Sequence, residues 1–551
     1  MLFKKHRIYV VFASIITYKN LFLSRIVVVK LEEKQTAVKD LRLRVAADLY
    51  LSRELRGDEV EKVAEYAVSS FPTVFARGAV KGEEPKIVEL TVTREKLSIT
   101  VESGRRVRAH EAVKRARKAL GEELGPKMGL GVRGISVKFF EVTFIGENLR
   151  EVRLPFARKV EKTEEGLKYW LELNESDLYA QVPDRIISLF MEKQEERVTG
   201  REVHRVVWCS PAKPVKYALD PGPLLEEEGW VKRFHPGIWY YLQPYTSLLR
   251  ILEEMIIEKV AKPLGFQEVV LPKLIPLEVA RKKGHLSGIP SEMLYVCEPG
   301  SRELSYFEEY TDLVKVFNEP RPEVLQKFLK EPAFTLPYAQ CEPFYELFAG
   351  ETVNLDNPPI RLYDRSGFSF RHEAGGLRSL ERLTAFTRIE IVYLGKPEEV
   401  AEIRDRLVDN YLSLLDKTLD IEVRSAEVTP VWMAHAGVVE DVSRKIVATF
   451  DIEAYLPFRG DRGSEWLEIA NASVHYDKYV DWFNIKERKG REVWTGCSGN
   501  GLERWVYAFL ARHGFNAEDW PVEVKRLWPN FKPVTMDTWP PRALKKPPES
   551  S

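Results

Sequence analysis

Alternation of apolar and polar positions marks the strands in the first third of the chain. The segments LTVTREKLSITVESG (residues 90–104) and GISVKFFEVTFIGENLREVRLPF (residues 134–156) alternate with the period of two that is typical of half-buried strands. Between them, HEAVKRARKALGEEL (residues 110–124) has the composition of a helix. We therefore predict an α+β domain over residues 31–170.

A different pattern follows this domain. NESD (residues 174–177) supplies helix-capping side chains at the start of DLYAQVPDRIISLFMEKQEE (residues 177–196), which predicts one helix. We expect this helix to form a linker over residues 171–205. After the linker, prolines and tryptophans become frequent, and aromatic strands alternate with short helices. We expect residues 206–551 to form a second domain.

The amino terminus differs from both domains. KKHR precedes an apolar run from Ile8 to Tyr18, as in a signal peptide, but no small-residue cleavage site follows. The run is also shorter than the roughly 20 residues that span a bilayer. We treat residues 1–30 as an extension of undefined structure and expect no membrane attachment.

Charge is distributed unevenly along the chain. The 83 basic and 83 acidic residues balance overall, but the first 150 residues have a net positive charge. A basic module beside an acidic one favours a protein that binds a polyanion, although a solvated charged surface is the simpler alternative. The four cysteines are widely separated and form no Cys-x-x-Cys pair, which indicates a reducing compartment, the cytoplasm, rather than a disulfide framework.

Two separated motifs predict a nucleotide site. FRHEAGGLRSLERLTAFTRIEIVYLG (residues 370–395) contains an Arg-x-Glu, a loop of small and basic residues and an aromatic strand, and GNGLERW (residues 499–505) follows much later. Alone, Arg371 and Glu373 would be interpreted as a surface ion pair on a hairpin. Together with the second motif, they resemble the ATP site of class II aminoacyl-tRNA synthetases. No P-loop sequence occurs in the chain.

Amino-acid adenylation requires fixed positive charge around the triphosphate, and arginine supplies it because its planar guanidinium binds phosphate bidentately. The resemblance implies two catalytic residues, Arg371 at the α-phosphate and the substrate carboxylate and Arg504 at the γ-phosphate. The implied ATP-binding set is Arg371, His372, Glu373, Arg382, Leu383, Glu468 and Arg504. His372 receives no catalytic role, because its side chain is expected to point away from the strand face of its neighbours.

Longer segments resemble one type within this class. LELNESDL, PYAQCEPFYELFAGETV, WLEIANASVHYDKYVDWFNI and WTGCSGNGLERW resemble the type-2 seryl-tRNA synthetases of methanogenic archaea, over about residues 42–527. The resemblance implies an α+β fold with a class II catalytic core, an antiparallel β-sheet flanked by helices, after a separate N-terminal α+β tRNA-binding domain. It also implies a homodimer, since Gly265 to Pro272 resembles motif 1 of class II enzymes, whose proline lies at the dimer interface.

The same resemblance implies a zinc ion in the amino-acid pocket, held by Cys341, Glu390 and Cys497. Two thiolates and a carboxylate suit Zn²⁺, and three protein ligands leave one position for the amino group of serine. Buried free cysteines are the simpler alternative, but they do not explain why Cys497 lies two residues before GNGLER. Cys209 and Cys297 match no ligand position.

The implied serine-binding set surrounds the metal. Asn471 is the candidate for recognising the hydroxyl group, and a site built to hydrogen-bond a hydroxyl strongly rejects alanine. Threonine must be excluded by crowding, a weaker effect of about 1–3 kcal/mol. Glu468 is expected to hold ATP through Mg²⁺. The full serine-binding set is Ala339, Arg371, Arg388, Ile389, Glu390 and Asn471.

The basic N-terminal domain is expected to bind tRNA-Ser, with tRNA-Sec as an additional candidate. Contacts to phosphate and sugar would dominate, because such domains recognise mainly the shape of the RNA. Each basic residue is alternatively a solvated surface charge. The candidate residues are Arg105, Arg106, Arg108, Lys114, Arg115, Arg117 and Lys118.

Other functions are compatible with parts of the sequence. A ligase that charges a carrier protein with an amino acid shares the catalytic core and zinc but lacks an N-terminal tRNA domain. An inactive relative would be expected to lack Arg371, Arg504 or a zinc ligand, and all are present. A threonine-specific enzyme is disfavoured because its zinc is held by one cysteine and two histidines. We therefore expect a cytoplasmic serine–tRNA ligase that uses ATP and L-serine.

Overall fold

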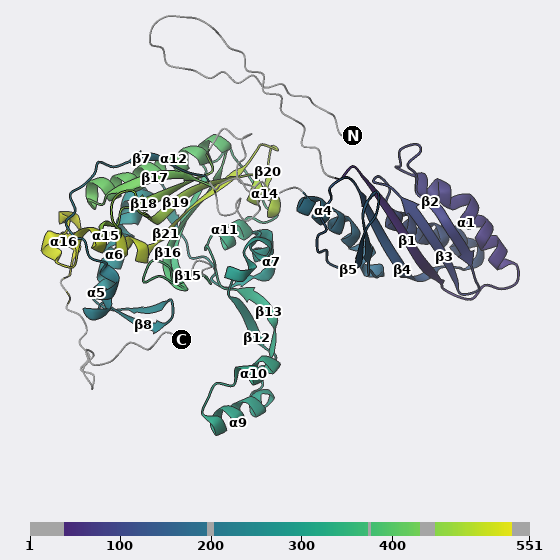
Figure 1. Ribbon diagram of the computed structural model, residues 1–551, viewed down its shortest axis with the longest axis horizontal. Helices are drawn as coiled ribbons and strands as arrows, with labels where there is room; N and C mark the ends of the chain where they lie inside the picture. The colour runs from purple at the N-terminus through teal and green to yellow at the C-terminus, as the bar shows by residue number, and fades with distance from the viewer. Residues whose placement is uncertain (1–37, 195–202, 373–375, 430–446, 530, 532–551) are drawn as a thin grey trace, which may run out of the picture. The chain divides into compact units, whose positions relative to one another are not determined.

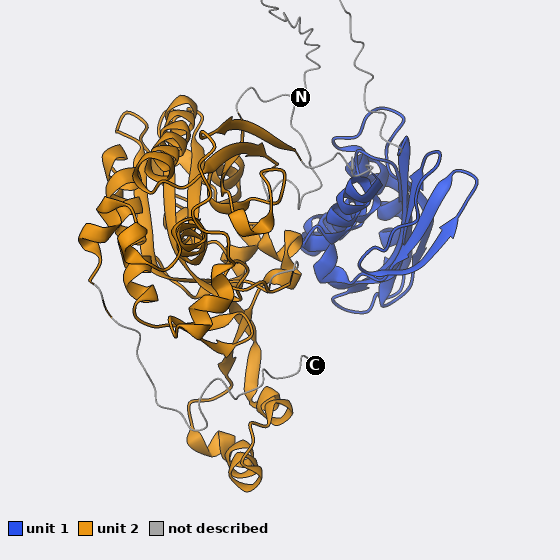
Figure 2. Cartoon of the chain, turned by 60° about the vertical axis from the view of Figure 1, so that its left-hand side comes forward, with its two compact units in different colours: residues 1–196 blue, residues 197–551 orange. Residues whose placement is uncertain are grey.

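The chain folds into two compact units, residues 1–196 and 197–551 (Figure 2). The computed structural model describes residues 38–194, 203–372, 376–429, 447–529 and 531. The extension predicted at residues 1–30 lies outside these ranges, and the four-part division of the chain stays a prediction. No helix within the described ranges has the length and apolar content that crossing a bilayer requires.

A six-stranded antiparallel sheet forms the centre of the first unit, in the order β2-β3-β1-β4-β6-β5 (Figure 1). One face of the sheet is apolar, and the helices α1 and α2 pack against it. The predicted helix and the strands within residues 90–104 and 134–145 are confirmed, but the strand predicted over residues 146–156 is wrong. The elements are β1 (Asp40–Leu51), α1 (Glu59–Ala76), β2 (Lys86–Val92), β3 (Lys96–Ser103), α2 (Ala109–Met128), β4 (Val132–Ile145), β5 (Ala157–Lys162) and β6 (Gly166–Leu171).

The single helix predicted after residue 174 is wrong, because the segment forms two helices, α3 (Glu175–Tyr179) and α4 (Val182–Gln194). Asn174 caps α3, since its side chain accepts a hydrogen bond from the backbone of Asp177 at 3.2 Å. Gln181 then adopts a left-handed conformation (φ 58°), which ends the first helix. The apolar face of α4 packs into the core of the first unit.

An eight-stranded sheet organises the second unit, in the order β10-β15-β16-β21-β19-β18-β17-β7. All neighbouring pairs are antiparallel except β10 and β15, which confirms the predicted fold class. Its strands are β7 (His204–Cys209), β10 (Gln267–Glu268), β15 (Ile360–Phe370), β16 (Ala385–Gly395), β17 (Val423–Val428), β18 (Thr449–Ala454), β19 (Leu467–Tyr476) and β21 (Trp494–Gly501).

The two faces of strand β16 have different partners. Ile389, Ile391 and Tyr393 are fully buried in a core formed with three helices, α6 (Tyr245–Ile256), α12 (Pro397–Ser413) and α15 (Leu502–His513). Successive side chains of a strand point to opposite faces. Arg388 and Glu390 therefore lie on the other face of the sheet, away from the helices.

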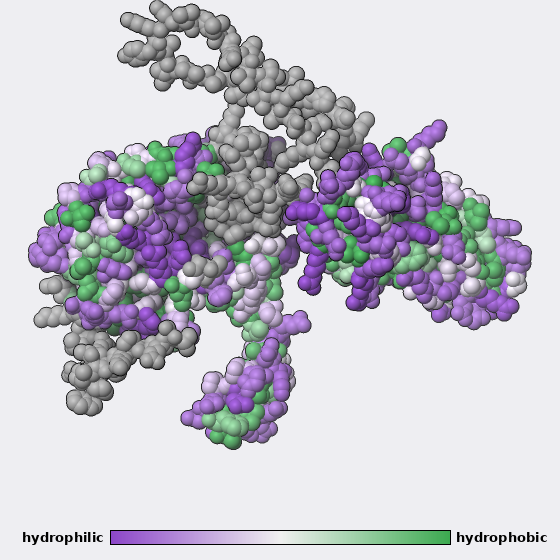
Figure 3. All heavy atoms as spheres, in the orientation of Figure 1, coloured by the Kyte–Doolittle hydropathy of each residue, from purple (hydrophilic) through white to green (hydrophobic). Residues whose placement is uncertain are grey.

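Shorter elements complete the second unit. An arm between β11 and α11 contains α9, α10 and the pair β12–β13, and apolar side chains such as Leu304 and Val316 are exposed on it (Figure 3). The remaining elements are α5 (Pro221–Glu227), β8 (Val231–His235), β9 (Ile238–Tyr241), β11 (Ile275–Pro276), α7 (Leu277–Lys282), α8 (His285–Gly288), β12 (Tyr295–Pro299), α9 (Glu308–Phe317), α10 (Pro322–Leu325), β13 (Leu329–Thr335), α11 (Glu342–Leu347), β14 (Thr352–Val353), α14 (Lys478–Trp482), β20 (Lys486–Glu487) and α16 (Val522–Leu527).

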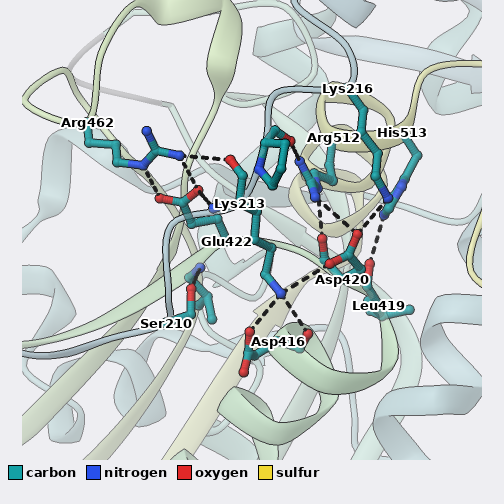
Figure 4. A network of polar contacts seen from close by, with 12 residues as sticks. Ser210, Lys213, Lys216, Asp416, Leu419, Asp420, Glu422, Arg462, Arg512 and His513 are labelled. Atoms are coloured by element: carbon teal, nitrogen blue, oxygen red, sulfur yellow. Dashed lines mark hydrogen bonds and ion pairs between the residues drawn. The ribbon is translucent and has the colours of Figure 1, made fainter.

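A polar network fixes the segment after β7 to the helical side of this unit (Figure 4). Lys213 forms ion pairs with Asp416 at 2.8 Å and with Asp420 at 3.1 Å. Asp420 also pairs with Arg512 at the end of α15, at 3.0 Å. Shared carboxylates of this kind hold three distant segments together, so the network stabilises the frame that surrounds the sheet.

Candidate functional site

Six of the predicted ATP- and serine-binding residues line one cavity on the open face of the large sheet. The register explains how they meet, because β16 and β19 both lie beside β21 and their outward side chains converge on it. The six residues are Arg371, Leu383, Arg388, Glu468, Asn471 and Arg504.

Gly499 allows Arg388 to enter this cavity. A Cβ atom at Gly499 would lie only 1.8 Å from Nη2 of Arg388, so any larger residue would displace the guanidinium group. The backbone N–H of Gly499 donates to Oδ1 of Asn471 at 3.2 Å, which orients that amide. At Gly501, by contrast, an added Cβ would make only an ordinary contact with Arg504. Of the two glycines in the second motif, only Gly499 is therefore required, because the Arg388 side chain occupies the space of a Cβ atom there.

Two of the arginines that line the cavity, Arg371 and Arg504, are held by different contacts. Arg371 lies between two rings, 4.2 Å from the centroid of Tyr338 and 5.4 Å from that of Phe386. Arg504 donates to the carbonyl of Glu381 at 2.8 Å and to the Glu468 carbonyl at 3.0 Å. Cations fixed in this way bind a polyanion without a large cost in side-chain entropy.

Arg388 is buried and pairs with a buried carboxylate. Its Nε lies 2.6 Å from Oε2 of Glu390. Burial by itself lowers the pKa of Arg388, but the Glu390 carboxylate outweighs this effect and the net pKa is raised. The guanidinium group therefore stays charged, and it connects the cavity to the next group of residues.

Cys341, Glu390 and Cys497 form a group that fits a metal ion. Their ligand atoms all lie within 4.8 Å of one another, although the residues come from three separate elements. Oε1 of Glu390 is buried and has no hydrogen-bond partner among the described residues. Two thiols and an unsatisfied carboxylate oxygen are a donor set that suits Zn²⁺. The group adjoins the cavity through the Arg388–Glu390 ion pair.

Other predicted residues lie outside the cavity lining. His372 contacts the carbonyl of Ser291 through Nδ1 at 3.1 Å. The backbone of Arg382 pairs with that of Arg378 in the loop. The Ile389 side chain packs against the helices on the other face of the sheet, so only the backbone of Ile389 can contribute to the site. Ala339 packs beside the metal-binding group, and Glu373 lies outside the described residues.

Sequence reasoning missed several polar residues near the site. Asp451 lies directly opposite Asn471 on β18, and burial and then Glu468 raise the pKa of its carboxyl well above the usual range. Burial also raises the pKa of Glu503 to about 7. The sequence could have indicated Asp451 as a site residue, because it is an acidic residue within an otherwise alternating strand. Lys283, which lies beside Cys341, gave no such indication because RKKGH is typical of a solvated charge run.

Most of the basic candidates on the first unit are engaged within it. Arg108 pairs with Asp184, Arg117 with Glu175 and Lys114 with Glu111. Arg115 donates to three backbone carbonyls, of Val74, Phe75 and Arg77. Arg105 donates to the carbonyl of Val38 at 3.0 Å and lies 3.6 Å from Asp40.

Two of the candidates are more available. Lys118 has an exposed side chain and lies 3.7 Å from Glu122. Arg106 is exposed and makes no hydrogen bond or ion pair with the described residues. These two residues are therefore the basic side chains of this set that can bind a partner at the lowest cost.

The first unit matches a family model described as a tRNA-binding domain, over residues 41–192. Over 470 residues the chain is 38% identical to a type-2 serine–tRNA ligase of Methanococcoides burtonii, and the match covers 85% of this chain and 93% of that protein. A type-2 serine–tRNA ligase of Methanocaldococcus jannaschii is 36% identical over 89% of this chain and 97% of its own length. The chain belongs to the type-2 serine–tRNA ligase family.

A solved structure of this family has the same fold. The crystal structure of A. aeolicus tRNASec in complex with M. kandleri SerRS matches with a TM-score of 0.79 and 33% identity. The match covers 89% of this chain and 96% of that chain, so it includes both units. The family resemblance inferred from the motifs is confirmed, and so is the mixed α+β architecture.

Proposed function

We propose that this protein activates L-serine with ATP and transfers the seryl group to tRNA-Ser. One observation carries the proposal: the Arg388–Glu390 ion pair joins an arginine-lined cavity to a thiol and carboxylate group suited to zinc. The cavity provides the positive charge that a nucleotide needs, and the metal-binding group provides a place for an amine. Membership of the serine–tRNA ligase family supports the same conclusion.

The first step is formation of seryl-adenylate. A carboxylate oxygen of serine attacks the α-phosphorus of ATP, the bond to the bridging oxygen breaks, and pyrophosphate leaves. Arg371 stabilises the charge that develops on the α-phosphate, and Arg504 binds the γ-phosphate. Glu468, which contacts Arg504 at 3.3 Å, would hold the Mg²⁺ that accompanies ATP. Leu383, on the cavity wall, packs against the nucleotide.

The serine pocket lies around Glu390 and Asn471. A zinc ion bound to Cys341, Glu390 and Cys497 would supply an open coordination position for the amino group of serine. Asn471 accepts the backbone N–H of Gly499 through its oxygen, and its NH₂ group donates to Oε1 of Glu468 at 3.3 Å. The second N–H of the amide is the donor that we assign to the serine hydroxyl. Arg371 binds the serine carboxylate from the side of the cavity. Ala339 and the backbone of Ile389 complete the wall.

The second step transfers the seryl group to tRNA. A hydroxyl oxygen of the terminal adenosine attacks the carbonyl carbon of the adenylate, AMP leaves, and a phosphate oxygen takes the hydroxyl proton. The first unit binds the tRNA, as its match to a tRNA-binding domain supports. tRNA-Sec is a further substrate candidate, because the matched M. kandleri enzyme is bound to a tRNASec. We also propose a homodimer, with residues 265–272 at the interface.

Amino-acid-dependent ATP–pyrophosphate exchange tests the proposal. All twenty amino acids are assayed with and without a zinc chelator, and charging of total tRNA follows. We expect exchange with serine that the chelator abolishes, and acylation of tRNA-Ser. Exchange with serine but no charging would favour a carrier-protein ligase instead. Exchange with a different amino acid, or with none, would contradict the proposal.

A further inference from the structure

Lys283 is a buried cation next to the metal-binding group. It directly follows α7, and its side chain is almost fully buried. Its Nζ lies 3.2 Å from Sγ of Cys341. It also lies 4.2 Å from the ring centroid of Tyr345 and 3.6 Å from that of Tyr479. The ammonium group therefore sits between two aromatic faces and a thiol.

Burial of an ammonium group costs several kcal/mol unless an anion or strong acceptors surround it. Among the described residues, no carboxylate lies within ion-pair distance of Lys283. Aromatic faces offset only part of the cost, roughly 2 kcal/mol when they are desolvated. The remaining partner is the sulfur of Cys341. This sulfur balances the positive charge of Lys283 only when it is a negatively charged thiolate.

Glu390 and Cys497, the other two residues of the metal-binding group, each have a hydrogen-bond donor of their own. Arg388 donates to Glu390 at 2.6 Å. Nε2 of His475 lies 3.5 Å from Sγ of Cys497, and Nδ1 of the same ring lies 3.2 Å from the Tyr345 hydroxyl. The Thr495 hydroxyl also lies 3.3 Å from Nδ1. With Nδ1 accepting from these hydroxyls, the ring proton is on Nε2, which faces the sulfur. Each of the three ligand side chains thus has one nitrogen donor, as second-shell partners of metal ligands commonly do.

We propose that Lys283 is a positioning residue for the metal site, donating to the Cys341 thiolate and balancing its charge. Three anionic ligands around a divalent ion leave one negative charge, which Lys283 offsets. Arg388 then remains to meet an anionic group of the substrate. The donor also fixes the direction of the Cys341 side chain before the ion binds. This inference rests on the zinc site proposed above.

Lys282 is the matched control, because it is the adjacent lysine and has different partners. Its Nζ lies 2.8 Å from Oε2 of Glu346 and 5.6 Å from the ring centroid of Phe483. The substitutions Lys283→Met and Lys282→Met each remove one positive charge and keep a straight apolar side chain. Any general effect of removing a positive charge from this segment is therefore common to both variants.

The first measurement is zinc affinity, by competition with a chromophoric chelator. We expect Lys283→Met to weaken zinc binding about 10- to 100-fold, the usual range for loss of a second-shell partner. Lys282→Met should match the parent protein. The thermal stability of metal-free Lys283→Met should not fall, because an apolar side chain replaces a buried charge. A residue with a purely structural role would show the reverse pattern, lower stability with unchanged zinc affinity.

A spectrum provides a second measurement. With Co²⁺ in place of zinc, loss of the donor leaves more electron density on the Cys341 sulfur. The thiolate-to-cobalt charge-transfer band of Lys283→Met should therefore move to lower energy, and that of Lys282→Met should not. Should Lys283→Met fail to fold, Lys283→Gln, neutral but polar, decides the question by the same competition.

The parent protein separates the two proposals. A folded parent that binds no zinc would refute the metal site itself. A parent that binds zinc, with a folded neutral variant at position 283 of equal affinity and an unchanged cobalt band, would refute only the role of Lys283.

Discussion

The two units of the molecule hold their basic side chains in opposite ways. In the first unit, Arg108 and Arg117 form ion pairs with partly exposed carboxylates at the rim of the domain. In the second unit, aromatic rings hold Arg371, and backbone carbonyls together with the Glu468 carboxylate at 3.3 Å hold Arg504. Both guanidinium groups line a cavity. The comparison separates cations that maintain a fold from cations that are kept ready for a ligand.

The difference between the two sets of arginines lies in how far their positive charge is already neutralised. The ion pairs of the first unit are partly buried and join separate elements, so they contribute to the fold, and RNA phosphates would compete with carboxylates that are already in place. Neutral rings orient Arg371 without neutralising it, so its charge remains available to a nucleotide. At Arg504 the Glu468 carboxylate offsets part of the charge, and two neutral backbone carbonyls orient the group. We expect substitutions in the cavity to abolish chemistry, and substitutions on the first unit to change tRNA affinity gradually.

The largest effect is expected at the metal-binding group. Cys341→Ala should remove the bound zinc and abolish serine-dependent pyrophosphate exchange, while ATP still binds, because the arginines of the cavity are unchanged. Zinc content, exchange rate and ATP affinity are the three measurements. Cys297→Ala, which removes a cysteine outside the group, is the control and should behave like the parent. Normal exchange by metal-free Cys341→Ala would contradict the zinc assignment.

Arg504→Ala should have the next largest effect. Loss of one preorganised cation at the triphosphate should lower the rate of pyrophosphate exchange about 100- to 1,000-fold, with zinc content unchanged. Arg406→Ala, an exposed arginine on α12, serves as the control. If both variants exchanged at the parental rate, the cavity would not be the triphosphate site.

A smaller effect is expected on the first unit. Arg106→Ala should weaken tRNA binding by less than about tenfold and reduce the salt dependence of binding by about one unit of slope, because one phosphate contact is lost. Serine activation should not change. Salt titration of tRNA affinity measures this effect.

Arg108→Ala, on the same loop, tests an arginine that is engaged in an ion pair against Arg106, which is not. Arg108 pairs with Asp184, which also contacts the buried His110 at 3.2 Å. This variant should therefore lower the melting temperature of the unit more than Arg106→Ala does. Equal melting temperatures combined with equal losses of tRNA affinity would remove the distinction between engaged and available arginines.

The smallest effect is expected at Glu503, whose pKa burial raises to about 7. The ordinary pKa of 4.5 applies to the unfolded chain. Between these values the folded protein keeps a proton that the unfolded chain releases, so this residue's contribution to stability is complete below pH 4.5 and is lost as the pH rises through 7.

The variant Glu503→Gln stays neutral and lacks this dependence. The melting temperature of Glu503→Gln minus that of the parent should increase by about 2–4 °C between pH 5 and pH 8. Glu402→Gln, on the exposed side of α12, should show no such trend. A difference that stays constant with pH would exclude Glu503 as the titrating group.

Local patterns in the sequence determined most of the elements of the first unit. Residues 90–92, 96–103 and 134–145 lie in strands and residues 110–124 in a helix, because period-two alternation and helical composition depend on near neighbours. Residues 146–156, which were also predicted as strand, form none. The break at Gln181 was missed although Pro183 indicates it, because proline is favoured in the first turn of a helix and disfavoured in its interior. The motifs also identified the family, since each preserves the residue types that a nucleotide site needs.

Only the tertiary structure decided which side chains meet. Cys341, Glu390 and Cys497 belong to distant segments, and no periodicity predicts that their ligand atoms converge; the family resemblance supplied that set. Lys283 belongs to a run of charges that is usually solvated, yet packing against two tyrosine rings buries it at Cys341. Hydrophobic alternation is a local property of the chain, whereas burial and charge pairing arise only when separate elements pack together.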